Sequence, residues 1–211
     1  LLVPGFIDVH VHGAMGLETM DANPDKILEM SIFYAKHGVT SFVPTTWAVP
    51  MDILLPVLEA IKKSKDLPHY GANILGAHIE SPFICKRKAG AQNPDHIFPA
   101  TPEMAQTLID QNIVKIITIA PEIPENLAIV PTLVDAGIVV SAGHTCANYD
   151  EIVTAVEHGI TSMTHTFNAM TGIHHREPGS AGAALTIDDL YTEVIADNIH
   201  LHPTILKLIV N

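Results

Sequence analysis

Two histidines stand at the end of the first apolar segment of the chain. That segment, residues 6–13, reads F-I-D-V-H-V-H-G, and its β-prone apolar residues predict a buried strand. Because successive side chains of a strand point to opposite faces, His10 and His12 should face the same way, with Asp8 behind them. Two imidazoles placed side by side form a pair of metal ligands. Taken alone, an H-x-H sequence fits a strand end with two solvated histidines equally well.

Three further strand ends each carry one candidate ligand. Glu80 ends one strand in G-A-H-I-E-S-P, His144 another in S-A-G-H-T, and His165 a third in M-T-H-T-F-N. Taken singly, the glutamate fits a loop cap and each histidine fits a hydrogen-bonded core residue. With His10 and His12 they supply nitrogen and oxygen ligands for one or two divalent ions, and zinc, iron(II), manganese and cobalt all accept such a set. Since an ion bound in this way converts water to hydroxide near neutral pH, the set predicts a metal-dependent hydrolase.

These residues must be positioned by strands that alternate with helices along the chain. Apolar strands are predicted at residues 6–12, 39–45, 72–79, 113–119, 138–142, 160–165 and 191–196. Helices are predicted at residues 25–37, 51–63, 102–112, 125–136 and 149–158, and another is predicted to start at Pro203. Long loops are predicted at residues 80–101 and 166–183.

This alternation predicts an α/β protein whose parallel sheet is covered by helices. Seven strand–helix units predict a (β/α)8 TIM-like barrel that lacks its last unit and forms one domain over residues 1–211, since complete barrels take about 250 residues. A doubly wound open sheet is the alternative. The barrel is favoured because it gathers the four ligand-bearing strand ends on one rim.

Composition narrows the class of protein. The 211 residues are 47% hydrophobic, which is enough for one sizeable core, and the net charge of −12 argues against a nucleic-acid partner. No apolar run approaches the roughly 18 residues of a membrane span. The N-terminus shows no signal peptide, and the only cysteines, Cys85 and Cys146, fit a reducing compartment without a disulfide framework. A cytoplasmic protein with no membrane contact is therefore expected.

The sequence P-G-F-I-D-V-H-V-H-G resembles the first-strand motif of the amidohydrolase superfamily. Later segments resemble, in family order and over nearly the whole chain, the motifs of N-acetylglucosamine-6-phosphate deacetylases: G-A-H-I-E-S-P-F, A-G-A-Q-N-P, I-A-P-E, S-A-G-H-T, T-H-T-F-N-A-M-T-G-I-H-H-R-E-P-G and I-A-D-N-I-H-L-H-P. The resemblance implies metal-dependent hydrolysis of the acetamide of N-acetylglucosamine 6-phosphate, which releases glucosamine 6-phosphate and acetate.

The resemblance also implies roles for single residues. Glu80, His144 and His165 match the ligands of the main metal ion. His10 and His12 match a pair that holds a second ion in members that keep both. The residues that match or face the substrate site, which grips the sugar hydroxyls and the phosphate, are Gln92, Asn168, Ala169, Arg176 and His200.

Arg176 carries a further implication. The matching family residue reaches into the active site of the neighbouring subunit, which implies a homodimer. An acidic protein needs a local cation for a phosphate, and arginine offers a bidentate fork. Without the surrounding motif, a surface salt bridge with Glu177 is the simpler interpretation.

Three departures from the family pattern stand out. Ser81 replaces a usual glycine and would crowd the metal loop if the backbone there required positive φ. Gln92 replaces a histidine that faces the substrate in some relatives. The catalytic aspartate of the family ends an eighth strand that would follow Asn211, and the family's small β-sandwich is absent, so the resemblance implies a fragment that contains no catalytic proton shuttle and is inactive alone.

Two other functions stay open. One is a related amidohydrolase that acts on a cyclic amide or on a different amino sugar. The other is an inactive, truncated barrel that only binds metal or ligand.

Overall fold

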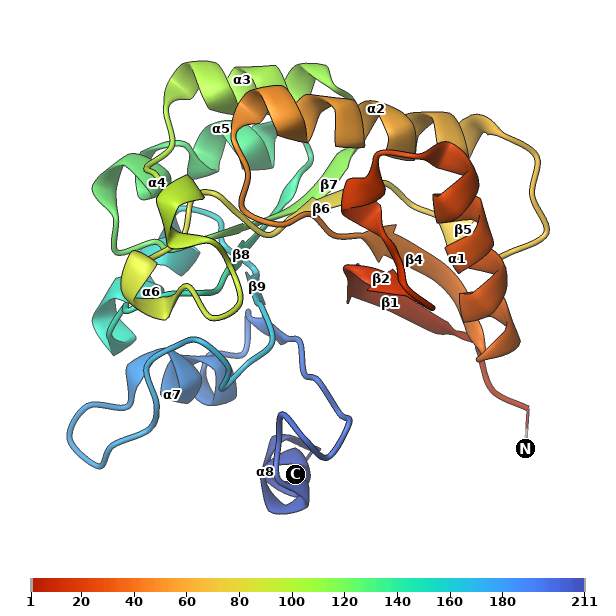
Figure 1. Cartoon of the computed structure of the whole chain (residues 1–211). Helices are drawn as coiled ribbons and strands as arrows, with labels where there is room; N and C mark the ends of the chain where they lie inside the picture. The colour runs from red at the N-terminus through yellow and green to blue at the C-terminus, as the bar shows by residue number, and fades with distance from the viewer. Residues whose placement is uncertain (1, 211) are drawn as a thin grey trace.

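Short strands alternate with helices along the chain, as the computed structural model shows for residues 2–210 (Figure 1). The strands are β1 (Phe6–Val11), β2 (Gly13–Ala14), β3 (Leu17–Glu18), β4 (Val39–Pro44), β5 (Asn73–Ile74), β6 (Ala77–Ile79), β7 (Val114–Ile119), β8 (Val139–Ala142), β9 (Ser162–Met163) and β10 (Tyr191–Thr192). The α-helices are α1 (Pro24–Lys36), α2 (Met51–Asp66), α3 (Pro102–Asp110), α4 (Pro124–Ala128), α5 (Val130–Asp135), α6 (Tyr149–Glu157), α7 (Gly179–Thr186) and α8 (Pro203–Val210). Short 3-10 helices are η1 (Thr19–Asp21), η2 (Lys86–Lys88) and η3 (Pro94–His96). None of the helices within residues 2–210 combines the length and apolarity of a membrane-spanning segment.

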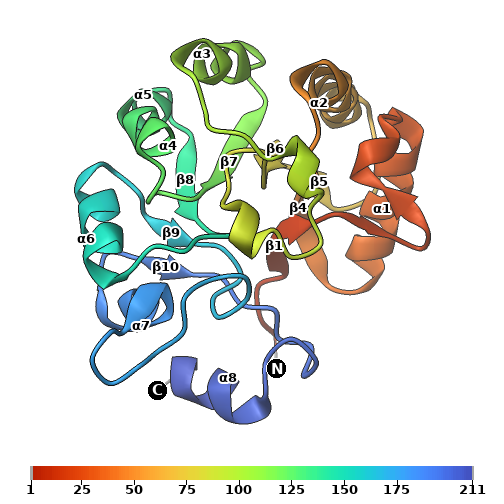
Figure 2. The same cartoon turned by 60° about the vertical axis from the view of Figure 1, so that its left-hand side comes forward.

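The strands of the barrel stand side by side in chain order. One sheet has the order β1–β4–β5 and a second has the order β6–β7–β8–β9–β10, and every pair in these two sheets is parallel. A separate antiparallel pair is formed by β2 and β3. A parallel bridge between Thr45 and His78 joins the two sheets, and the helices lie outside the curved inner layer (Figure 2). Because the strand order never reverses, the predicted incomplete α/β barrel is confirmed and the doubly wound alternative is wrong.

Helix α1 shows how the outer layer is attached. The side chain of Asn23 caps it by accepting backbone N–H bonds from the first turn. Ile27, Met30 and Tyr34 share one face of the helix because of their spacing, and all three are buried in the main core. The hydroxyl of Tyr34 donates a 2.9 Å hydrogen bond to the carbonyl of Gly13. The helix therefore holds the chain that leaves β1, where the first two candidate ligands lie.

The structure differs from the predicted helices and loops at α7 and at α4–α5, and the predicted strand 72–79 is divided into β5 and β6. The predicted loop 166–183 ends in helix α7, which begins at Gly179. Glycine lowers helix propensity, but the run G-S-A-G-A-A is buried and packs on α6, and this packing decides the local structure. The predicted helix 125–136 is instead two short helices, α4 and α5, which meet at Ile129. Pro131 has no N–H group to continue the hydrogen bonding of α4.

A buried histidine links the strands inside the barrel. Burial lowers the pKa of His78 to about 4, so the ring is neutral at pH 7. Its Nδ1 lies 3.0 Å from the carbonyl oxygen of Val9 and donates to it, and its Nε2 lies 2.8 Å from Thr118 Oγ1 and accepts from it. Thr118 Oγ1 is 2.9 Å from Thr164 Oγ1, which is 2.6 Å from Ser141 Oγ. This network joins β1 to β6, β7, β8 and the end of β9.

We expect His78→Leu to lower the free energy of unfolding by about 2–6 kcal/mol, because two buried polar groups lose their partner at about 1–3 kcal/mol each. Urea denaturation followed by circular dichroism measures the change. The control is His158→Leu: that ring is exposed and, within residues 2–210, bonds only the Thr154 carbonyl one helical turn earlier. A His78→Leu protein as stable as the His158→Leu control would contradict a structural role for the network.

Candidate metal centre

The carboxylate of Glu80 lies at the centre of the five candidate ligands. Its Oε1 is 3.0 Å from Nε2 of His144 and 3.1 Å from Nε2 of His165. On the other side, Nε2 of His10 is 3.2 Å from Oε1, and Nε2 of His12 is 3.1 Å from Oε2. The structure thus brings together all five residues that the sequence suggested as ligands.

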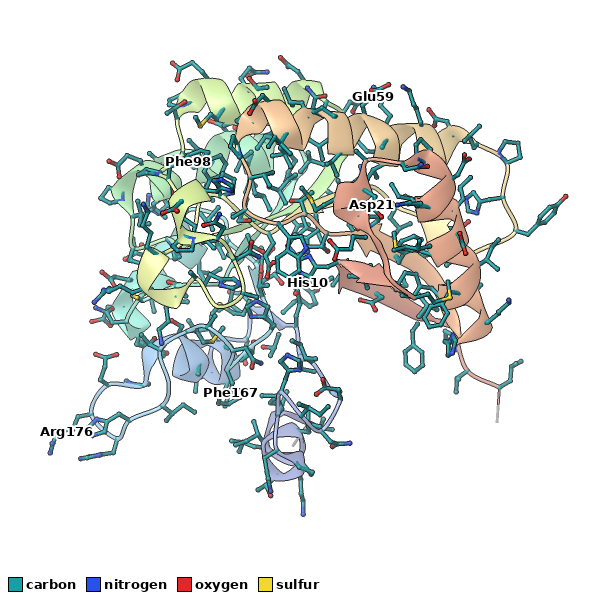
Figure 3. All side chains as sticks on the ribbon, in the orientation of Figure 1. His10, Asp21, Glu59, Phe98, Phe167 and Arg176 are labelled. Atoms are coloured by element: carbon teal, nitrogen blue, oxygen red, sulfur yellow. The ribbon has the colours of Figure 1, made fainter. Side chains whose placement is uncertain are left out.

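Each ligand comes from the carboxyl end of a parallel strand. His10 is the next-to-last residue of β1, His12 directly follows that strand, and Glu80 directly follows β6. His144 and His165 each follow their strand, β8 and β9, by two residues. Parallel strands end on one rim of a barrel, and His10 points from this rim toward the centre of the molecule (Figure 3).

The spacing of the ligand atoms fits metal ions. Nε2 atoms lie 3.0 Å apart in the pair His144–His165 and 3.2 Å apart in the pair His10–His12. Two imidazole lone pairs at this distance repel each other unless a proton or a cation lies between them. The atoms form two groups that share Glu80, and within each group they lie within 4.8 Å of one another. The arrangement suits two ions that share the Glu80 carboxylate, or a single ion bound by one of the two groups.

Charge at the cluster also favours a cation. Burial would raise the pKa of Glu80, but hydrogen bonds from the four surrounding histidines hold that pKa well below its usual range. Burial also opposes charge on His10, yet the carboxylates of Glu193 and Glu80 raise the pKa of His10 to about 9. An ionised carboxylate that attracts protons to its neighbours has the field that a divalent cation requires.

Orienting contacts lie behind the ligands. The Lys88 carbonyl accepts a 2.7 Å hydrogen bond from the Nδ1–H of His144, which leaves Nε2 of that ring free to bind a metal. The ring of His12 stacks on Trp47, with ring centroids 3.7 Å apart. Asp8 makes a backbone contact: its Oδ1 accepts a hydrogen bond from the His10 N–H at 3.2 Å.

Gln92 touches Glu80 and not the open cleft. Its Nε2 donates to Glu80 Oε2 at 2.5 Å, while its Oε1 accepts from the Ala48 N–H at 2.6 Å and the Ser81 hydroxyl at 3.2 Å. Ser81 does not have positive φ, so its side chain does not crowd the loop. Both departures from the family pattern therefore belong to one hydrogen-bonded unit behind the carboxylate.

Several residues around the cluster have left-handed backbone conformations. His144 has φ 46°, His165 φ 32°, Phe167 φ 77° and Ala169 φ 50°. Such conformations cost non-glycine residues about 1–2 kcal/mol each. Backbone bonds hold them in place, including Asn168 N–H to the His165 carbonyl at 2.9 Å. In these conformations the side chains of His144 and His165, two candidate ligands, reach Glu80.

A cleft of about 1070 Å³ opens above the cluster, between β1 and the segment that follows β10. Of the predicted substrate-site residues, Asn168, Ala169 and His200 line it. Nδ1 of His200 is 2.7 Å from Oδ2 of Asp197. Hydrogen bonds from the backbone and the ring of His200 lower the pKa of Asp197 to about 2, so this carboxylate is a weak base.

Arg176 does not line the cleft. It is exposed on the loop before α7 and points away from the barrel (Figure 3). The alternative salt bridge with Glu177 is not formed in the described residues; Glu177 Oε1 instead accepts from the N–H groups of Tyr149 and Gly179.

Two residues that line the cleft, Trp47 and Glu193, were not among the predicted site residues. Trp47 follows β4, and Glu193 follows β10 with its Oε2 3.8 Å from His10 Nδ1. Glu193 lay inside a predicted strand, 191–196, that in fact ends at Thr192. An acid or an aromatic residue at a strand end was the available signal for both residues, since strand ends carry the site.

We expect Gln92→Ala to weaken metal binding about 10–100-fold, because partners that orient a metal ligand contribute that much to affinity. Competition with a chromophoric chelator measures the dissociation constant. Gln106→Ala is the matched control, since among the described residues its side chain bonds only Asp110, on the exposed face of α3. Unchanged affinity in the Gln92 variant would show that Glu80 needs no support.

Known proteins similar to this chain identify its family. A model of the Amidohydrolase family matches residues 1–211. The N-acetylglucosamine-6-phosphate deacetylase of Bacillus subtilis (strain 168) is 38% identical over 213 residues, which cover 99% of this chain and 54% of that protein. The N-acetylgalactosamine-6-phosphate deacetylase of Escherichia coli O157:H7 is 34% identical over 211 residues, covering 99% and 56%. The chain spans about half the length of the curated relatives it matches.

Solved structures agree. The N-acetylglucosamine-6-phosphate deacetylase from Pasteurella multocida has a TM-score of 0.92 and 32% identity, over 98% of this chain and 54% of that one. The D267A mutant of the deacetylase from Mycobacterium smegmatis, in complex with N-acetyl-D-glucosamine-6-phosphate, has a TM-score of 0.92 and 33% identity over the same shares. Because the family model matches residues 1–211, the chain belongs to the amidohydrolase family.

Proposed function

We propose that the protein containing this chain removes the acetyl group from N-acetylglucosamine 6-phosphate and releases glucosamine 6-phosphate and acetate. The observation that carries this proposal is the convergence of four histidines on Glu80 at the floor of a cleft. Relatives at 38% and 34% identity are named as deacetylases of phosphorylated amino sugars, which supports the substrate class.

Glu80, His144 and His165 would hold the main ion, and His10 with His12 would hold a second ion against the same carboxylate. The chemistry supplied there is polarisation of the acetamide carbonyl and acidification of water. Zinc, iron(II), manganese and cobalt all suit the nitrogen and oxygen ligands.

The other lining residues bind and orient the sugar. His200, held by Asp197, presents its Nε2 for a hydrogen bond to a hydroxyl or phosphate oxygen. The Asn168–Ala169 segment lies beside His165 and offers polar groups next to the ligands. Gln92 supports binding indirectly by fixing Glu80. We assign no proton shuttle to Asp197, because its low pKa makes it a weak base.

We further propose a homodimer in which Arg176 of each subunit binds the phosphate in the partner's cleft. Support comes from the exposed position of Arg176, away from its own cleft, and from the net charge of −12, which leaves a phosphate dependent on local cations. Because sugar phosphates do not cross membranes unaided, we propose a cytoplasmic location.

The test is acetate release by the protein in its natural length, loaded in turn with zinc, iron(II), manganese and cobalt. Substrates are N-acetylglucosamine 6-phosphate, its galactosamine epimer and unphosphorylated N-acetylglucosamine. We expect turnover of the first that exceeds both others. No acetate from any substrate, with the metal bound, would contradict the proposal, and preference for the epimer would reassign the sugar.

A further inference from the structure

The two cysteines of the chain lie side by side although they are 61 positions apart in sequence. Their Sγ atoms are separated by 3.1 Å. Cys85 lies in the loop after β6, directly before η2, and Cys146 lies in the loop after β8. Both are free thiols, and neither residue is fully exposed. The fold thus builds a dithiol that the sequence spacing does not suggest.

Backbone contacts hold both cysteines beside a candidate metal ligand. The Cys85 N–H donates to the His144 carbonyl at 2.9 Å, and the Cys146 N–H donates to Glu122 Oε1 at 2.6 Å. The Lys88 carbonyl, at the end of η2, accepts from Nδ1 of His144. The two loops therefore meet at His144 through two hydrogen bonds and one sulfur–sulfur contact.

We propose that Cys85 and Cys146 form a reversible disulfide that fastens the loop after β6 to the loop that carries His144. A disulfide bond is about 2.05 Å long, so the sulfurs need to approach by only about 1 Å. Formation of the bond does not depend on the function proposed above. Its effect on His144 rests on that function, because it assumes that His144 binds metal.

The oxidant is a small-molecule disulfide of the glutathione class. One cysteine sulfur attacks it and forms a mixed disulfide, and one small thiol leaves with the proton of that cysteine. The second cysteine sulfur attacks the protein sulfur of the mixed disulfide, and the second small thiol leaves with the second proton. Two protein thiols lose two electrons in total, and the small disulfide gains them as two thiols.

A metal site made of Cys85, Cys146 and Glu122 is the competing interpretation, since their ligand atoms lie within 4.8 Å of one another. The contacts disfavour it. Both oxygens of Glu122 already accept hydrogen bonds, one from the Thr145 hydroxyl at 2.5 Å and one from the Cys146 N–H. The Arg87 guanidinium also lies beside the sulfurs and would repel a cation.

The experiment treats the reduced, natural-length protein with oxidised glutathione and maps the thiols by mass spectrometry. We expect a peptide pair linked through Cys85 and Cys146, and its separation by dithiothreitol. Oxidation should raise Tm by about 3–10 °C, because the bond closes a long loop. EDTA should remove bound metal from the oxidised protein about tenfold more slowly, since His144 is held more rigidly.

Single variants provide the controls. Cys85→Ser and Cys146→Ser should each stop at a mixed disulfide with glutathione and show no rise in Tm. Wild-type protein that also stops at mixed disulfides would overturn the proposal. So would reduced Cys85→Ser protein that binds one zinc ion per chain fewer than the reduced wild type, because the cysteines would then form a metal site. Equal rates of metal loss from the oxidised and reduced proteins would overturn the link to His144. None of these readouts requires deacetylase activity, so they fail independently of the proposed function.

Discussion

Glu80→Gln should bind metal poorly and lower kcat/KM for acetate release by about 10³-fold or more. Glu80 is the residue that contacts all four histidines of the cluster, and a neutral amide replaces its charge. A bound ion stabilises the transition state by several kcal/mol, and about 4 kcal/mol corresponds to 10³-fold in rate. Elemental analysis of the purified variant and steady-state kinetics at saturating metal measure the two effects.

Glu59→Gln is the matched control for this change. Glu59 is exposed on α2 (Figure 3) and forms a 3.5 Å ion pair with Lys63, so its loss should leave metal content and kcat/KM unchanged. If Glu80→Gln retained a full complement of metal and wild-type kinetics, the cluster would be a structural hydrogen-bonding group and the proposed hydrolase site would have to lie elsewhere.

Arg176→Ala should lower kcat/KM for the phosphorylated sugar by about 10²–10⁴-fold, which corresponds to two charge-assisted hydrogen bonds at about 1.5–3 kcal/mol each. Activity on the unphosphorylated sugar should not change. Arg176→Lys keeps the charge but loses the bidentate hydrogen bonding, so its kcat/KM for the phosphorylated sugar should lie between those of the wild type and Arg176→Ala. Equal losses on both sugars would show that Arg176 supports the loop and does not bind the phosphate.

Mixed dimers separate the two possible locations of the phosphate contact. When Arg176→Ala and Glu80→Gln subunits are combined in equal amounts, half of the dimers should contain one of each if exchange is random. If Arg176 serves the partner's cleft, each mixed dimer has one intact site, and about a quarter of wild-type activity should return. Mixtures without any recovery would place the arginine in its own subunit's site or outside the site.

The convergence of the five candidate ligands could be predicted because these residues follow a local rule. His10, His12, Glu80, His144 and His165 all stand where an apolar strand ends, and parallel topology alone brings such ends together. The meeting of these strand ends does not depend on side-chain rotamers or on the path of any loop. The confirmed barrel follows from the same alternation of apolar strands and helices.

The parts that could not be predicted depend on loops. Gln92 lies in the loop 80–101, and only the path of that loop turns its amide onto Glu80 and away from the cleft. Trp47 and Glu193 are ordinary residues in sequence, and they join the site through ring stacking and charge across strands. Helix α7 forms because small residues become buried against α6, and this burial is not visible in the local sequence.

The left-handed residues around the cluster set a conflict between heat resistance and activity. His144 and His165 have conformations that glycine or asparagine would adopt at lower cost, and each strained residue costs about 1–2 kcal/mol. Selection for thermal stability alone should therefore replace these histidines and disable the proposed site, as stabilising substitutions commonly do where function requires strain. Engineering of a more thermostable variant should instead leave the residues at the strand ends unchanged and stabilise the helices outside the barrel.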